Sequence, residues 1–143
     1  MNVEAILGSK GRDVLTVSPD ASILDASNIL SAKKIGALVV SADGVTALGI
    51  ITERDIVNAI GARGPSALDQ TVDSLMTRDI RTCALDDTGH ELLSAMTDGR
   101  FRHVPVIENG KLCGIVSIGD VVKSRLEEIT READAMREYI TSN

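Results

Sequence analysis

The chain has 143 residues, of which 43% are apolar and 25% are charged, so it suits one compact globular domain or two small halves that share a core. Its formal net charge of −6 argues against broad binding to nucleic acid or to an anionic membrane, because both need a basic face. Phe101 and Tyr139 are the only aromatic residues, too few for a protein that stacks single-stranded bases on aromatic side chains.

The first predicted elements follow the order β-α-β-β-α. Residues 14–17 favour a short strand, and the spacing of Ser22 and Asp25 favours a helix start, in which the hydroxyl caps a free N–H and the carboxylate reaches back to the cap. Apolar residues at helical spacing follow, and a continuous apolar run at residues 37–40 then predicts a buried strand. An Asp-Gly dipeptide favours a hairpin turn into a third strand at residues 48–51, which leads into a second helix.

The second half of the chain repeats this order, with strands predicted at residues 80–83, 104–107 and 112–116 and a helix start at Thr88. The last helix keeps an apolar stripe from residue 121 to residue 140, so its surplus face covers part of the core or pairs with another subunit. We divide the chain into an N-terminal segment (1–12), a first repeat (13–64), a second repeat (65–128) that takes in part of a linker around residues 61–77, and a C-terminal helical extension (129–143).

The clearest sign of this repetition is a segment of nine residues. Residues 49–57 (GIITERDIV) return 65 residues later as residues 114–122 (GIVSIGDVV), with four positions identical and three conservatively replaced. An internal repeat of this kind means two copies of one supersecondary unit. Because neither half has enough apolar surface to fold comfortably alone, we predict an α/β (α+β) fold in which two β-α-β-β-α repeats pack sheet to sheet in a pseudo-twofold arrangement.

Residues 35–40 (IGALVV) and 102–106 (RHVPV) accompany the repeated segment. Together these segments resemble a tandem pair of cystathionine-β-synthase-type (CBS) domains, a Bateman module, over roughly residues 10–130. The resemblance implies a regulatory module in signal transduction that binds an adenine nucleotide, such as AMP, ATP, NAD(H) or S-adenosylmethionine, in clefts between the repeats. It also implies a homodimer.

The repeated segment offers the chemistry that a nucleotide needs. A carboxylate accepts hydrogen bonds from two adjacent ribose hydroxyls, a role that suits Asp55 and Asp120. Phosphate prefers hydroxyl donors, helix N-terminal N–H groups and a nearby cation, which suits Thr52, Ser117 and Arg54. The resemblance adds residues that line an adenine slot or contact phosphate, namely Thr16, Ala37, Thr82, Arg102, His103, Val104 and Pro105.

A plainer interpretation competes with this one. Thr52 with Asp55, and Ser117 with Asp120, also have the spacing of ordinary helix capping boxes, in which the carboxylate bonds the N–H of the cap residue. The two roles are compatible, so the spacing alone leaves both open.

The two repeats also differ in their cations. The first has Arg54 where the second has Gly119, and our alignment sets RHVP at residues 102–105 against IGAL at residues 35–38. We therefore expect two sites that bind different ligands, or one that binds much more weakly. The sequence does not say which cation serves which cleft.

Three classes of function remain to be compared. No paired nucleophile and base, phosphate-binding loop or His/Cys cluster with metal spacing marks the chain as an enzyme, so we expect none, and neither catalytic nor metal-binding residues. A nucleotide sensor that acts on a separate, unidentified protein target is the preferred interpretation, and a ligand-free assembly module is the alternative.

We find no signal peptide and no apolar run near the ~18 residues of a membrane span, so we expect a cytoplasmic protein.

Overall fold

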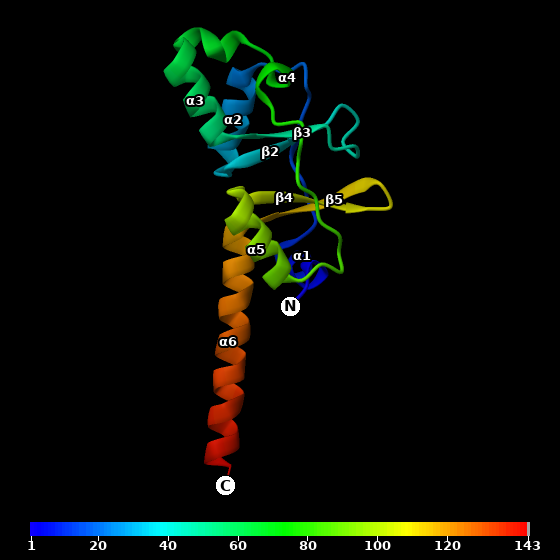
Figure 1. Ribbon diagram of the computed structural model, residues 1–143, viewed down its shortest axis with the longest axis vertical. Coiled ribbons are helices and arrows are strands. Elements are labelled where there is room, and N and C mark those ends of the chain that lie inside the picture. Colours follow the sequence, from blue (N-terminus) through cyan, green and yellow to red (C-terminus); the bar gives the residue numbers. More distant parts are fainter. Residues whose placement is uncertain (143) are drawn as a thin grey trace.

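The computed structural model describes residues 1–142, and it confirms the predicted α/β architecture of two repeats. Figure 1 shows two halves stacked along the long axis, with their sheets facing each other in the middle and the last helix running away from the body. In chain order the elements are α1 (Val3–Lys10), β1 (Thr16–Val17), α2 (Ile23–Lys33), β2 (Ala37–Val40), β3 (Gly49–Thr52), α3 (Glu53–Arg63), η1 (Pro65–Asp69), α4 (Val72–Leu75), α5 (Gly89–Gly99), β4 (His103–Glu108), β5 (Lys111–Ser117) and α6 (Ile118–Thr141).

The two sheets differ in size. In the first half β1 runs parallel to β2, and β2 pairs antiparallel with β3. In the second half β4 and β5 form an antiparallel pair, while the segment predicted as a first strand makes only one parallel bridge, between Cys83 and Val106. The Leu112 amide donates to the Val45 carbonyl at 2.8 Å and so joins the two hairpins across the middle of the molecule.

Each of two segments, residues 1–12 and 65–75, precedes one half in the sequence but packs against the other half. Helix α1 lies in the second half, where Val3 is fully buried and its amide donates to the Asp87 carbonyl at 2.9 Å. Elements η1 and α4 cover the first half, where the Val72 amide donates to the Ala21 carbonyl at 2.8 Å and Met76 completes the core. The core of the first half therefore extends beyond residue 64, and the sequence pattern indicated no helix in either segment.

The strand register corrects our alignment of the two repeats. Strand β2 pairs Ala37 with Thr52, and strand β4 pairs His103 with Ser117. Since Thr52 and Ser117 are equivalent in the repeated segment, His103 is the counterpart of Ala37. The sequence alignment set Val104 against Ala37 and is wrong by one residue, because a run of apolar residues does not fix its own register.

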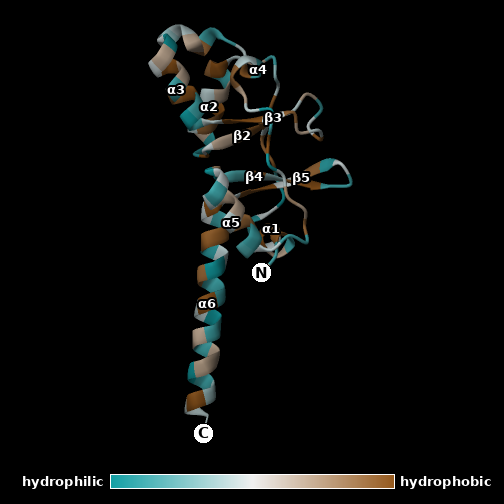
Figure 2. Ribbon diagram, in the orientation of Figure 1, coloured by the Kyte–Doolittle hydropathy of each residue, from teal (hydrophilic) through white to brown (hydrophobic). Residues whose placement is uncertain are grey.

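Helix α6 has the predicted apolar stripe, but within the described residues only Val121 of this helix is buried. Leu126, Met136 and Ile140 are 59%, 61% and 67% exposed. Figure 2 shows hydrophobic and hydrophilic residues alternating along the protruding helix. The stripe therefore covers the core only at its first turn, and its pairing with another subunit stays a prediction. No helix among residues 1–142 is long and apolar enough to cross a membrane.

Candidate functional site

The two copies of the repeated segment fold into the same local structure. Thr52 Oγ1 accepts a hydrogen bond from the Asp55 amide at 3.2 Å, and Asp55 Oδ2 accepts one from the Thr52 amide at 3.0 Å. Ser117 and Asp120 form the same pair of hydrogen bonds, at 3.1 and 2.8 Å. Both segments are capping boxes, as their spacing predicts, and a ligand-binding role for the two carboxylates stays a prediction.

The other two predicted helix starts make only half of this arrangement. Ser22 accepts from the Asp25 amide at 3.0 Å, and Thr88 accepts from the Glu91 amide at 3.1 Å. In neither helix does a carboxylate bond the amide of the cap residue among the described residues. The reciprocal box is therefore particular to the repeated segment.

A cleft of about 400 Å³ lies between the two halves, beside the first of these boxes. Its first-half wall is the start of α3 together with Gly36, Ile50 and Thr77, and its second-half wall consists of residues 79–81 and of residues 99–103, where α5 ends and β4 begins. Because the walls come from both repeats, a ligand in this cleft contacts both halves at once.

Six of the twelve predicted site residues line this cleft, namely Thr52, Arg54, Asp55, Arg102, His103 and Pro105. The structure thus places Arg54 and the Arg102–His103 pair in one cleft. The sequence alone did not say which cation serves which cleft. The other six lie elsewhere: Thr16 on β1, Thr82 on an exposed extended segment, Ala37 and Val104 buried in their strands, and Ser117 and Asp120 at the start of α6.

Arginine side chains surround the cleft. Arg54, Arg100 and Arg102 form no ion pair with any residue from 1 to 142. The Arg81 guanidinium lies 5.8 Å from the centroid of the Phe101 ring. Carboxylates are present in the lining as well, but these guanidinium groups remain available to an anion, and the narrow space between protein walls strengthens their field.

His103 is half-buried and lies next to Gly36, so close that a Cβ added to this glycine would lie 3.6 Å from His103 Nε2. Burial lowers the pKa of His103 below its ordinary value, and Lys10 and Arg102 lower it further, against the opposing charges of Asp120 and Glu53. The imidazole is therefore neutral at pH 7.

Sequence reasoning missed several residues of the cleft. Ile80 and Arg81 come from the linker, and Arg100 and Phe101 come from the left-handed turn that ends α5. The basic run of residues 100–103 (RFRH) could have indicated Arg100 and Phe101 as well, but the prediction from sequence names only Arg102 and His103 as site residues. Among the described residues no group of His, Cys, Asp or Glu side chains is arranged to hold a metal ion.

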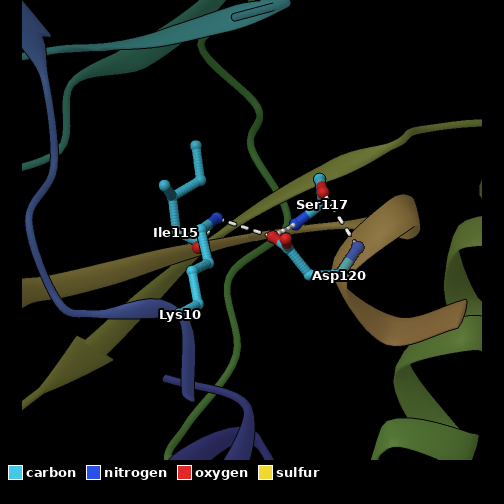
Figure 3. A network of polar contacts seen from close by, with 4 residues as sticks. All are labelled: Lys10, Ile115, Ser117 and Asp120. Atoms are coloured by element: carbon cyan, nitrogen blue, oxygen red, sulfur yellow. Dashed lines mark hydrogen bonds and ion pairs between the residues drawn. The ribbon is translucent and has the colours of Figure 1, made fainter. Parts of the chain in front are cut away.

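Asp120 has a different environment from Asp55. Lys10 Nζ lies 2.6 Å from Asp120 Oδ2 and 2.7 Å from the carbonyl oxygen of Ile115, and Figure 3 shows the ammonium group between these two oxygens. Burial acts to raise the pKa of Asp120, but the hydrogen bonds and charge of Lys10 together with the Ser117 amide outweigh it, so the pKa lies below its ordinary value.

The two repeats match one family. The family model for the CBS domain matches residues 7–62 and residues 72–127. This chain belongs to the CBS domain family. Among curated relatives, the mitochondrial CBS domain-containing protein CBSX3 of Arabidopsis thaliana is 33% identical over 96% of this chain and 71% of its own length.

Solved structures of CBS-domain proteins share the fold. The CBS-domain containing protein of Agrobacterium tumefaciens is 53% identical, with a TM-score of 0.84 over 87% of this chain and 99% of that one. The CBS domain pair of protein MJ0100, in complex with 5′-methylthioadenosine and S-adenosyl-L-methionine, is 25% identical, with a TM-score of 0.78 over 90% and 98% of the two chains. A CBS domain protein of Pyrobaculum aerophilum, complexed with AMP, is 25% identical, with a TM-score of 0.74 over 84% and 89%.

Proposed function

We propose that this CBS pair is a regulatory module that binds a phosphorylated adenine nucleotide in the cleft beside Asp55 and transmits its presence to a separate protein. The observation that carries the proposal is the cleft itself, in which one capping-box carboxylate faces several arginines without ion-pair partners among residues 1–142. The AMP and S-adenosylmethionine complexes of similar CBS pairs support an adenosine ligand for a module of this kind.

The chemistry of the lining suggests how the nucleotide lies. Asp55 uses Oδ2 for the Thr52 amide, and its Oδ1 has no hydrogen-bond partner among residues 1–142, so it can accept from the ribose hydroxyls. Phosphate groups would lie against Arg54 and Arg102, which both face the cleft. Phe101 provides an apolar surface for the adenine ring.

The charges favour AMP, ATP or NAD(H) over S-adenosylmethionine. A sulfonium cation placed beside Arg54, Arg81 and Arg102 would be repelled, whereas a phosphate there gains charge-assisted hydrogen bonds. Arg100 is a fourth guanidinium group on the same lining, against the three carboxylates of Glu53, Asp55 and Asp79. We therefore rank nucleotides that carry two or more phosphates above AMP.

Regulation follows from the position of the cleft between two halves. A ligand that contacts α3 on one side and residues 99–103 on the other favours one arrangement of the halves, and a partner that reads this arrangement responds. We propose a homodimer in which the exposed apolar stripe of α6 packs against a second copy, since Leu126 and Met136 are more than half exposed in the described chain.

A ligand-free assembly module is the alternative function, and the uncovered face of α6 is the observation that favours it. It predicts that Asp55 acts only as a helix cap and that nucleotides leave the protein unchanged. We propose no catalytic activity for either function. One curated relative carries a mitochondrial location in its name, so a cytoplasmic location for this chain stays a prediction.

The test is thermal unfolding with AMP, ADP, ATP, NAD, NADH and S-adenosylmethionine, for the wild type, Asp55→Ala and Asp25→Ala. Asp25 is a matched control because it occupies the same third helical position behind a Ser cap but lies outside the cleft. A ligand at a hundredfold excess over Kd stabilises the folded state by about 2.7 kcal/mol, which raises the melting temperature by several degrees.

We expect this shift with ATP in the wild type and in Asp25→Ala, and its loss in Asp55→Ala. A wild type that no nucleotide stabilises, with Asp55→Ala no different from Asp25→Ala, would contradict nucleotide binding and support the assembly module.

A further inference from the structure

The carboxylate of Asp120 is the equivalent of the proposed ribose acceptor Asp55, yet a cation from the same chain already holds it. Its Oδ2 accepts from both the Ser117 amide at 2.8 Å and Lys10 Nζ at 2.6 Å. The capping box alone occupies the corresponding oxygen of Asp55. The two otherwise identical boxes therefore differ in one added partner, which comes from a segment 110 residues away in the sequence.

Lys10 occupies a place in the second half that a backbone amide of the linker occupies in the first half. In the first half the Ile50 carbonyl accepts from the Thr77 amide of the linker at 2.9 Å, so backbone fills this place. In the second half the equivalent carbonyl of Ile115 accepts from Lys10 Nζ at 2.7 Å. A charged side chain thus stands where the first half has a peptide group, and it reaches the neighbouring carboxylate.

Helix α1 holds this lysine in place. Val3, Ile6 and Leu7 are buried in the core of the second half, and Lys10 is the last helical residue, followed by Gly11, whose amide closes the helix on the Leu7 carbonyl. The side chains of Lys10 and Asp120 are only 33% and 24% exposed. Because the helix backbone is already ordered by its buried face, the ion pair costs the rotamer freedom of the Lys10 side chain but no further ordering of the backbone.

The Asp120 side also has fewer cations than the first cleft, although Lys34, the left-handed C-cap of α2, corresponds to Arg100, the C-cap of α5. Gly119 replaces Arg54 in the repeated segment, and Leu15, which precedes Thr16 as Arg81 precedes Thr82, replaces that arginine. An incoming nucleotide would meet an Asp120 carboxylate whose charge Lys10 already neutralises through Oδ2, although its Oδ1 has no partner among residues 1–142, and it would find two fewer guanidinium groups for its phosphates.

We propose that Lys10 acts as an internal occupant of the second CBS site, so that the chain binds one nucleotide, beside Asp55, and leaves the Asp120 site closed. This inference rests on the proposed nucleotide binding at the Asp55 cleft. Removal of the Lys10 charge frees the Asp120 carboxylate and opens a second, weaker site.

The test is isothermal titration calorimetry with ATP, and again with AMP, on the wild type, Asp55→Ala, Lys10→Met and the double variant Asp55→Ala/Lys10→Met. Lys111→Met is the control, since Lys111 is an exposed lysine on β5 without an ion pair among the described residues. If Lys10→Met does not fold, Lys10→Gln replaces it, because the amide keeps a donor for the Ile115 carbonyl without the charge.

We expect one site per chain in the wild type and in Lys111→Met, none in Asp55→Ala, two in Lys10→Met and one in the double variant. Two sites in the wild type, or one site in Lys10→Met with none in the double variant, would overturn the role of Lys10. No binding to the wild type but one site in the double variant would refute nucleotide binding beside Asp55 and still support the inference. No binding to any variant would overturn both.

Discussion

The two halves of this CBS pair carry the same motif and use it in different surroundings. The boxes at Thr52–Asp55 and Ser117–Asp120 have nearly the same hydrogen-bond lengths. Around Asp55 the structure gathers arginines in a cleft, and against Asp120 it places one lysine. The comparison teaches that the motif makes the helix start, whereas segments from elsewhere in the chain decide whether its carboxylate is available to a ligand.

The largest expected effect on stability comes from substituting Gly49 and Gly114, the glycines that begin the two copies of the repeated segment. A Cβ at position 49 would lie 2.7 Å from the carbonyl oxygen of Thr77 and 2.9 Å from Met76 Sδ, whereas a Cβ at position 114 would lie 2.7 Å from the Cδ1 atom of Leu7. Backbone yields less than the end of a leucine side chain. We expect Gly49→Ala to lower the free energy of unfolding by about 2 kcal/mol, within the range for overpacked sites, and Gly114→Ala to lower it by less.

Urea unfolding of the two glycine variants measures this difference directly. Equal losses of stability would mean that the Leu7 side chain yields no more readily than the Thr77 backbone, and the expected difference between the two halves would be wrong.

The ion pair of the second half gives a smaller effect that depends on pH. We expect Lys10→Met to cost about 1 kcal/mol at pH 7, the scale of a partly exposed pair with charge-assisted hydrogen bonds. The pKa of Asp120 lies below its unfolded value of about 4, so its contribution is present above that pH and is lost as the pH falls through the folded-state pKa. Stability curves of wild type and Lys10→Met should therefore converge in acid.

Urea titrations from neutral to acidic pH measure this convergence, with Lys111→Met as the control. A constant difference between wild type and Lys10→Met at every pH would show that the loss comes from the packing of the lysine stem and not from the Asp120 pair.

The smallest effect concerns His103, the counterpart of Ala37 in the first half. Its pKa is lowered by burial and by Lys10 and Arg102, and the groups that oppose this are Asp120 and Glu53. A phosphate bound in the cleft adds negative charge and raises this pKa, so binding takes up a proton. We expect the affinity for NAD, whose diphosphate does not itself titrate near neutral pH, to rise as the pH falls, because the imidazole takes up a proton more readily in the complex.

Calorimetry at several pH values measures this linkage, with His103→Gln as the variant and the exposed His90→Gln as the control. The pH dependence should disappear in His103→Gln alone. If it persists there, another group of the cleft takes up the proton.

The order of elements and both helix starts in each half could be predicted, because apolar spacing and capping residues act over a few neighbouring positions. The segments at residues 1–12 and 65–75 could not, since their short helices depend on packing against the opposite half. The one-residue error at Val104 has a similar cause, because only cross-strand hydrogen bonds fix the register of an apolar run.

Local sequence order makes this chain a tandem repeat with a hydroxyl and a carboxylate at the start of one helix in each copy. That Arg54 and Arg102 share a cleft, and that Lys10 neutralises Asp120, follows from the packing of segments far apart in the chain. The physical reason is range. Capping boxes close over three residues and are written in local order, whereas the charge around each carboxylate comes from side chains that meet only when the two halves pack together.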